Sequence, residues 1–325
     1  MPITEVVSNA QSLSLTIVAE YPVPVERLWD AYADPRQLER FWGPETYPAT
    51  FTRHDMAVGG ESHYYMTGPD GTKSSGWFRF TAIEPHRRIE LVDGFAGDDG
   101  KPNPDMPTMV MTFTFEPTAT GSRFRNVTQF PSVEAMEQVL SMGMEEGLRS
   151  AMGQIDAVVA DLKSFAAHHV ADAQLLDDTH VRVSRVIRGS AEQVWRAHQE
   201  PALMKRWLLG PDGWTMPVCK VATKVGDHYR YEWEAADGSQ RFGFEGELLE
   251  VVKPYRAVTS ERMMDTDGPN VRNELTLVSV EGGTLLSIVM TYPSKHLRDM
   301  ILGTGMVGGM EQSYARLERE VLAAA

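Results

Sequence analysis

Residues 144–162 read MEEGLRSAMGQIDAVVADL, and this stretch decides the fold of the first half of the chain. Apolar residues recur in it at three- and four-residue spacing while charged residues fill the positions between, which predicts a helix with one apolar face. Such a helix must cover another apolar surface, so we expect it to lie on a sheet. The predicted apolar face consists of Met144, Leu148, Ala151, Met152, Ile155, Val158, Val159 and Leu162.

A second stretch, residues 306–322 (MVGGMEQSYARLEREVL), has the same apolar spacing and ends the second half of the chain. Both predicted helices carry glycines near their beginnings. A glycine inside a helix costs about 1 kcal/mol relative to alanine, so we expect either close backbone packing or an open space there. These glycines are Gly143 and Gly147 in the first stretch and Gly305, Gly308 and Gly309 in the second.

The composition limits the classes of partner. A chain of 325 residues, 42% of them hydrophobic, is long enough for two globular domains. Its formal net charge of -14 argues against nucleic acid and anionic membrane as partners, since both require a basic surface. No apolar run is long enough to span a membrane, and the first residues lack a charged and apolar leader. The single cysteine, Cys219, cannot form an internal disulfide or a cysteine-based metal site, so we expect a cytoplasmic protein.

The chain contains an internal repeat. Residues 23–44 (VPVERLWDAYADPRQLERFWGP) align with residues 189–211 (GSAEQVWRAHQEPALMKRWLLGP), and the correspondence continues to Gly143-Met144 and Gly305-Met306. Two copies indicate a tandem of whole domains and not a solenoid. We predict a first domain at residues 1–165, a linker at 166–178 and a second domain at 179–325.

Each copy reads as strand, two short helices, a series of strands and one long helix. In the first copy residues 13–22 form an alternating strand, and Asp34-Pro35 separates the two short helices. Alternating runs and hairpin turns then predict about six or seven strands per copy, with a long polar loop at residues 93–107. Because the strands are neighbours in sequence, we expect an α+β fold with an antiparallel sheet covered by the last helix.

The motifs also resemble a known family. A Trp-bearing helix, DP...L..FWGP, HDMAVGGESHYYMTGPDG and a late GM.EGL helix are similar to the Activator of Hsp90 ATPase homologue 1-like family of the START/Bet v 1 (SRPBCC) superfamily. The resemblance covers both copies and implies two tandem helix-grip (START/Bet v 1-like) domains, each a curved antiparallel sheet around a long C-terminal helix with a cavity between them. It rests on Trp29, Pro35, Trp42, Gly43, Pro44, Asp55, Gly59, Gly60, Pro69, Asp70, Gly71, Gly143 and Gly147, and in the second copy on Trp195, Pro201, Trp207, Gly210, Pro211, Gly226, Asp237, Gly238, Gly305 and Gly309.

The second copy departs from this pattern at two positions. Asp227 replaces the second glycine of the Gly59-Gly60 pair, and Ala222 stands where the first copy has Asp55. We therefore expect the two pockets to differ.

Aromatic and methionine side chains are suited to line an apolar pocket. The chain has 18 methionines, whose flexible thioethers fit a pocket that adapts to varied apolar ligands. The same side chains are equally suited to filling a core, but the glycines at the helix beginnings favour a pocket. We therefore predict binding of a small hydrophobic or amphipathic molecule. The predicted ligand-binding residues are Trp42, Tyr64, Met66, Met109, Met111, Met144, Trp207, Tyr229, Tyr231, Trp233, Met290 and Met306.

Two other functions stay open. A polyketide cyclase- or hydrolase-like enzyme would use His54, His63 or a pocket tyrosine, but His63 alternates with Tyr64 and so is expected to face solvent. The resemblance also implies a module that modulates a chaperone (Hsp90) ATPase. No phosphate-binding loop, dinucleotide fingerprint, HExxH or Gly-x-Ser-x-Gly motif is present, so we expect no cofactor and no metal, and a binding role rather than an enzymatic one.

Overall fold

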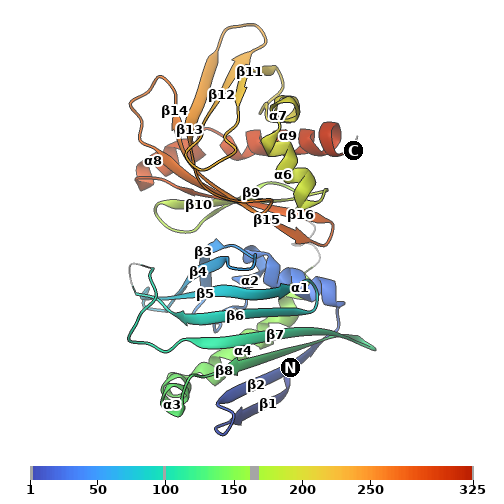
Figure 1. Ribbon diagram of the computed structural model, residues 1–325, viewed down its shortest axis with the longest axis vertical. Coiled ribbons are helices and arrows are strands. Elements are labelled where there is room, and N and C mark those ends of the chain that lie inside the picture. The colour runs from blue at the N-terminus through green and yellow to red at the C-terminus, as the bar shows by residue number, and fades with distance from the viewer. Residues whose placement is uncertain (1–2, 98–99, 162–167, 324–325) are drawn as a thin grey trace. The chain divides into compact units, whose positions relative to one another are not determined.

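The computed structural model describes residues 3–97, 100–161 and 168–323. The chain divides into two compact units, Met1–Lys163 and Ser164–Ala325 (Figure 1). Each unit is an α+β structure with one antiparallel sheet, as the sequence predicts. Residues 162–167, which include Leu162 of the predicted helix and part of the predicted linker, lie outside the described residues.

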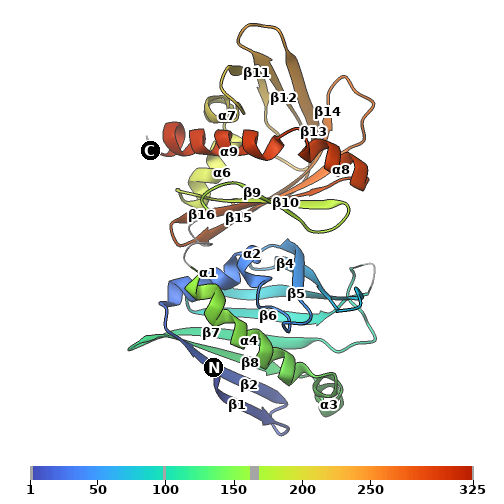
Figure 2. The ribbon, with the colours of Figure 1, turned by 180° about the vertical axis from the view of Figure 1, so that it is seen from behind.

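The first unit has an eight-stranded antiparallel sheet in the order β1-β2-β8-β7-β6-β5-β4-β3. Helix α4 crosses one face of this sheet (Figure 2). The strands are β1 (Ile3–Asn9), β2 (Ser14–Tyr21), β3 (Ala49–His54), β4 (Glu61–Thr67), β5 (Lys73–Glu84), β6 (Arg88–Phe95), β7 (Met109–Thr118) and β8 (Gly121–Gln129), and the helices are α1 (Val25–Ala33), α2 (Pro35–Leu38), α3 (Val133–Ser141) and α4 (Met144–Ala160).

The second unit repeats this arrangement, with the strand order β11-β12-β13-β14-β15-β16-β10-β9. Its long helix is α9, which ends in the π-helical turn η1. The strands are β9 (Asp172–Leu175), β10 (His180–Ile187), β11 (Trp214–Lys220), β12 (His228–Ala235), β13 (Arg241–Val252), β14 (Arg256–Met263), β15 (Val271–Val280) and β16 (Gly283–Thr291), and the helices are α6 (Ala191–Gln199), α7 (Pro201–Trp207), α8 (Lys295–Leu302), α9 (Met306–Leu317) and η1 (Glu318–Leu322).

Helix α4 is fixed to its sheet by apolar packing and by hydrogen bonds to its backbone. Its predicted apolar face is confirmed, since Met152, Ile155 and Val159 are buried. The Tyr21 hydroxyl donates a hydrogen bond of 3.1 Å to the backbone carbonyl of Met152. The Arg27 guanidinium donates one of 2.8 Å to the carbonyl of Val158. The helix is therefore a fixed wall of the unit's interior.

In the second unit an ion-pair cluster joins the long helix to the sheet. The buried Arg185 on β10 lies 2.9 Å from Glu311 and 3.0 Å from Glu318. Tyr314 and Leu317 supply the apolar contact on the same side. Removing the arginine would take the ion-pair partner from Glu311 and leave Glu318 with the exposed Arg188 at 4.0 Å.

The glycines at the helix beginnings have a backbone role. Gly143 precedes α4 with φ of 88°, and Gly305 precedes α9 with φ of 80°. This left-handed conformation favours glycine, and it turns the chain from α3 into α4 and from α8 into α9. The short helices α3 and α8 were not predicted from the sequence. Gly147 needs no such freedom, because a Cβ there would make an ordinary contact of 3.7 Å with Pro44. The expectation of close backbone packing is therefore wrong for Gly143 and Gly305, since a Cβ on Gly143 would come no nearer than 4.0 Å to another group and a Cβ on Gly305 would have no neighbour within 4 Å. The alternative expectation, an open space, agrees with the surroundings of Gly305.

The sheets are larger than predicted, with eight strands in place of six or seven. The edge strand β1 is largely exposed and so lacks the apolar alternation that marks a buried strand. Strand β9 lies within the predicted linker. The predicted loop at residues 93–107 begins too early, because Asp93, Gly94 and Phe95 pair with β5 as the end of β6. Residues 98–99 of that loop lie outside the described residues.

Candidate functional site

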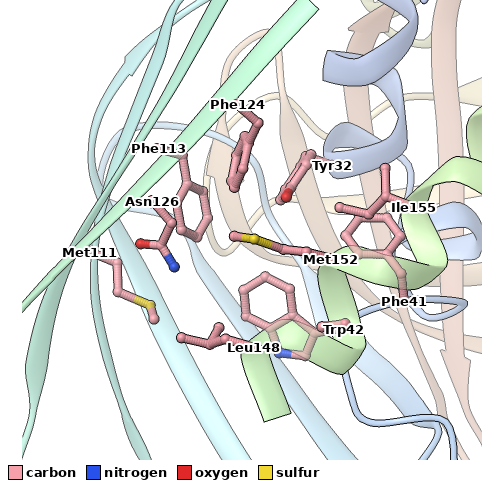
Figure 3. Close-up of a pocket in the computed structure, with 11 residues that line it drawn as sticks. Tyr32, Phe41, Trp42, Met111, Phe113, Phe124, Asn126, Leu148, Met152 and Ile155 are labelled. Atoms are coloured by element: carbon pink, nitrogen blue, oxygen red, sulfur yellow. The ribbon is translucent and has the colours of Figure 1, made fainter. Parts of the chain in front are cut away.

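A small, partly open cavity lies between the sheet and α4 in the first unit. Its volume is about 50 Å³, room for one or two water molecules. Figure 3 shows side chains from the sheet on one side and from α4 on the other. Phe41 and Trp42, which follow α2 in the chain, also line the cavity. The lining consists of Tyr32, Phe41, Trp42, Met111, Phe113, Phe124, Asn126, Leu148, Ala151, Met152 and Ile155.

Aromatic rings stack on one side of the cavity. Tyr32 stacks on Phe124 with ring centroids 5.0 Å apart and an interplanar angle of 20°. Burial raises the pKa of the Tyr32 hydroxyl well above its ordinary value, so this group stays protonated at neutral pH. Asn126 supplies the lining's side-chain amide, which Figure 3 shows among Met111, Phe113 and Met152.

A cluster of aromatic rings continues from the cavity along the inner face of β3 to β5. Trp42 lies 5.8 Å from Tyr64 and 5.2 Å from Phe78, measured between ring centroids. Gly76 makes room for this packing, because a Cβ there would lie 2.5 Å from the Tyr64 ring. Trp42 and Tyr64 are only partly buried, so the cluster reaches the edge of the interior.

The six predicted ligand-binding residues of the first unit fall into three groups. Trp42 and Met111 line the cavity. Tyr64 and the buried Met109 lie on the same inner face of the sheet, beyond the cavity wall. Met66 and Met144 are partly buried, Met66 on β4 and Met144 at the start of α4.

The sequence reasoning did not assign the rest of the lining to a site. Most of these side chains lie at inward positions of β7 and β8 or on the apolar face of residues 144–162, while Tyr32 is on α1 and Phe41 follows α2. Strand alternation and helical spacing are the signals that could have found them. They are Tyr32, Phe41, Phe113, Phe124, Asn126, Leu148, Ala151, Met152 and Ile155.

In the second unit the predicted residues are spread over several clusters, two of which share Tyr231. Trp207 is buried in the main core and donates a hydrogen bond of 3.0 Å to the carbonyl of Ala197. Trp233 stacks on Phe242 at 5.1 Å in another cluster. Two further clusters hold the remaining predicted residues, Tyr229 and Tyr231 in one and Met290 and Met306 in the other.

Each sheet also carries one carboxyl group on its inner face that the sequence reasoning missed. Asp93 on β6 is 9% exposed, and burial raises its pKa to about 7. Glu261 is the corresponding residue on β14, and burial raises its pKa as well. Glu261 accepts hydrogen bonds from the Tyr229 hydroxyl at 3.1 Å and from the Asn273 amide at 3.2 Å.

The two histidines considered as catalysts do not line the cavity. His54 is buried, and its ring nitrogens lie 2.8 Å from the Ser62 hydroxyl and 3.2 Å from the Tyr32 carbonyl. His63 is partly exposed and lies 3.2 Å from Glu61. Both histidines therefore have structural partners.

Within the described parts of the chain, no group of three or more His, Cys, Asp or Glu side chains is placed to hold a metal ion. A wider hollow of about 410 Å³ lies over β12 to β14 in the second unit. Its lining is polar and of mixed charge, and its Arg262 and Glu245 already pair with each other. It is thus unlike an apolar ligand pocket.

A family model described as Activator of Hsp90 ATPase homolog 1-like protein matches two segments, residues 22–160 and 188–321. The chain belongs to this family. The resemblance noted from the motifs is confirmed, since each segment falls within one unit and contains its long helix. No relative was found among curated proteins.

Solved structures of similar proteins match about half of the chain. A solution NMR structure of a protein from Arthrobacter aurescens is 46% identical and covers 48% of this chain and 91% of its own, with a TM-score of 0.47. A crystal structure of a protein from Mycobacterium smegmatis is 46% identical and covers 48% of this chain and 96% of its own, with a TM-score of 0.46. A crystal structure of a protein from Rhodobacter sphaeroides is 30% identical and covers 48% of this chain and 99% of its own, with a TM-score of 0.45.

Among the helices in the described part of this family member, none has both the length and the apolar character that a membrane crossing requires.

Proposed function

We propose that the first unit of this protein binds a small hydrophobic or amphipathic molecule between its sheet and α4. The observation that supports this is the cavity lined by aromatic rings and thioethers at the place where the helix-grip fold encloses space.

The cavity must enlarge to hold a ligand. Pockets for drug-sized molecules measure about 300–1,000 Å³, several times the 50 Å³ present here. Met111, Leu148 and Met152 line the cavity with unbranched or flexible side chains, and Leu148 is only partly buried. We infer that these three side chains move when the ligand enters, while the stacked Tyr32 and Phe124 stay in place.

A titration with a neutral apolar dye tests this proposal. N-phenyl-1-naphthylamine is added to the full-length protein and its fluorescence is followed, and native mass spectrometry of freshly purified protein looks for a retained ligand. We expect a saturable rise in fluorescence that an unlabelled apolar competitor reverses. A linear response without competition, together with bare protein in the mass spectrum, would show that the cavity takes no ligand.

The chaperone role suggested by the family description stays a prediction. Titrating the protein into a bacterial Hsp90 and following ATP hydrolysis tests it separately. A changed rate at saturating protein supports a modulating role, and an unchanged rate rejects it.

A further inference from the structure

Asp93 faces the same interior as the cavity. In the sheet register, Asp93 pairs with the buried Phe78 on β5 and the buried Met109 on β7. Two residues earlier, Leu91 pairs with Met111, which lines the cavity. Residues two apart on a strand project from the same face, so the Asp93 side chain lies one inward position along the strand from the cavity wall.

The surroundings of Asp93 are aromatic and apolar. The Phe78 ring opposite Asp93 lies 5.2 Å from Trp42 and 6.2 Å from Tyr64. Tyr64 is the titratable neighbour, and after burial the Asp93 charge is the next cause that raises the pKa of its hydroxyl. Phe78 and Met109, on the two flanking strands, do not titrate. Among the described residues, burial is the sole cause that shifts the pKa of Asp93, and no group there hydrogen-bonds its carboxyl.

The second unit shows what a satisfied carboxyl at this position looks like. Glu261 pairs with Gly246 and Val271, as Asp93 pairs with Phe78 and Met109. The Glu261 carboxyl takes its two hydrogen bonds from Tyr229 on β12 and Asn273 on β15.

Both of these donors are absent at the matching positions of the first unit. Tyr229 pairs with Gly246, the β13 partner of Glu261. In the first unit the residue that pairs with Phe78, the β5 partner of Asp93, is Ser62, so Ser62 corresponds to Tyr229. The Ser62 hydroxyl lies 2.8 Å from His54 and is already engaged there. Asn273 corresponds to Met111, whose thioether donates no hydrogen bond. With 9% of its surface exposed and no donor from the matching positions, the Asp93 carboxyl is left to water or to a ligand group as its hydrogen-bond donor.

We propose that Asp93 is the polar anchor of the ligand site in the first unit, and that the ligand is a small apolar molecule carrying a protonated amine. An ammonium group donates hydrogen bonds to a carboxylate, and the faces of Trp42, Tyr64 and Phe78 attract a cation. An anionic ligand is disfavoured because its charge would face Asp93. This inference rests on the proposed function and specifies the class of ligand.

Three probes that share one ring system test the anchor. They are 1-naphthylmethylamine, 1-naphthalenemethanol and 1-naphthoic acid, which carry a cationic, a neutral and an anionic group, and each is titrated into the full-length protein by calorimetry at about pH 8. The amine should bind at least about tenfold more tightly than the alcohol, the ratio expected for one hydrogen bond between charged groups, and the acid should bind most weakly.

Two variants assign the effect to the residue. Asp93→Asn should weaken amine binding by about tenfold or more and leave alcohol binding unchanged within about twofold. Glu261→Gln, the matched control in the second unit, should change neither the affinity for the amine nor the affinity for the alcohol. In the wild-type protein, amine affinity should also fall as the pH decreases from about 8 to 5, because Asp93 becomes protonated and no longer attracts a cation.

The outcomes separate this inference from the proposed function. If the alcohol binds but the amine binds no better, or if Asp93→Asn leaves amine binding intact, the anchor is rejected while the cavity proposal stands. If none of the three probes binds, both are rejected. An amine preference that disappears in Asp93→Asn and persists in Glu261→Gln supports both.

Discussion

Trp207 and Tyr314 stack in the second unit with ring centroids 5.7 Å apart and an interplanar angle of 24°. The matching positions of the first unit hold Phe41, which like Trp207 follows an arginine, and Met152, which like Tyr314 is the ninth residue of its helix. Both first-unit residues line the cavity. The second unit therefore fills with larger rings the region that the first unit leaves partly empty.

Met152→Tyr should close the cavity of the first unit. The larger ring would occupy the 50 Å³ space, and any remaining overlap would be absorbed by the flexible Met111 and Leu148. We expect apolar dye affinity to fall by at least about tenfold, with a loss of no more than about 2 kcal/mol in the free energy of unfolding. Fluorescence titration and thermal unfolding measure the two effects. Tyr314→Met in the other unit serves as the control and should leave dye affinity unchanged, whereas undiminished affinity in Met152→Tyr would place the site elsewhere.

Asp93 should make the first unit less stable as the pH rises. The unfolded chain releases this proton near pH 3.8 and the folded chain near pH 7, so between these values the folded state binds the extra proton. The free energy of unfolding is therefore not reduced by Asp93 below about pH 4. It decreases as the pH rises from about 4 to about 7, and it does not change further above about pH 7. Asp93→Asn should therefore stabilise the unit at pH 8 relative to wild type, by at most about 4 kcal/mol, and have little effect at pH 4.

Hydrogen exchange of peptides from β6 and β7, read by mass spectrometry, reports this unit separately from the other. The comparison of wild type and Asp93→Asn at the two pH values is the measurement. A difference of equal size at both would mean that the Asp93 proton is not responsible.

The second unit should show the opposite pH dependence through His198. Its Nδ1 lies 2.7 Å from the Val194 carbonyl, Nε2 is buried without a partner, and burial lowers its pKa to about 4. Because the unfolded chain takes up the proton near pH 6.5 and the folded chain only near pH 4, stability is present above pH 6.5 and is lost as the pH falls between these values. The loss should approach about 3 kcal/mol.

NMR titration of the His198 ring gives its midpoint directly. His198→Phe keeps an aromatic ring beside Trp207 and should flatten the acid side of the stability profile of the second unit. A midpoint near the ordinary value of 6.5 would contradict the buried, neutral state.

The sequence predicts the framework well because its signals are local. The spacing in residues 144–162 predicts α4, and Asp34-Pro35 separates α1 from α2 as expected. The structure adds that the Asp34 side chain caps α2 by accepting a hydrogen bond from the Arg36 amide. Asp93 was assigned to a loop for the same reason, because Asp-Gly followed by a glycine-rich stretch is a local signal for a turn. Non-local pairing with β5 and β7 makes Asp93 part of strand β6. Asn126 was missed because a polar residue is not ordinarily assigned to an inner face, although it alternates with the buried Phe124 and Thr128.

The contact between Tyr64 and Gly76 offers a test of the inner face itself. A Cβ on Gly76 would lie 2.5 Å from Cζ and Oη of Tyr64, too close for any real contact, so Gly76→Ala must displace the ring. We expect a loss of about 1–3 kcal/mol in the free energy of unfolding and a shift in Trp42 fluorescence, because Trp42 packs on the displaced ring. Combining Gly76→Ala with Tyr64→Leu should cost less than the sum of the two single changes, since the smaller side chain removes the overlap. Additive losses in this double-mutant cycle would mean that the two residues do not share the space, and that Tyr64 does not hold the inward position from which it meets Trp42 and Asp93.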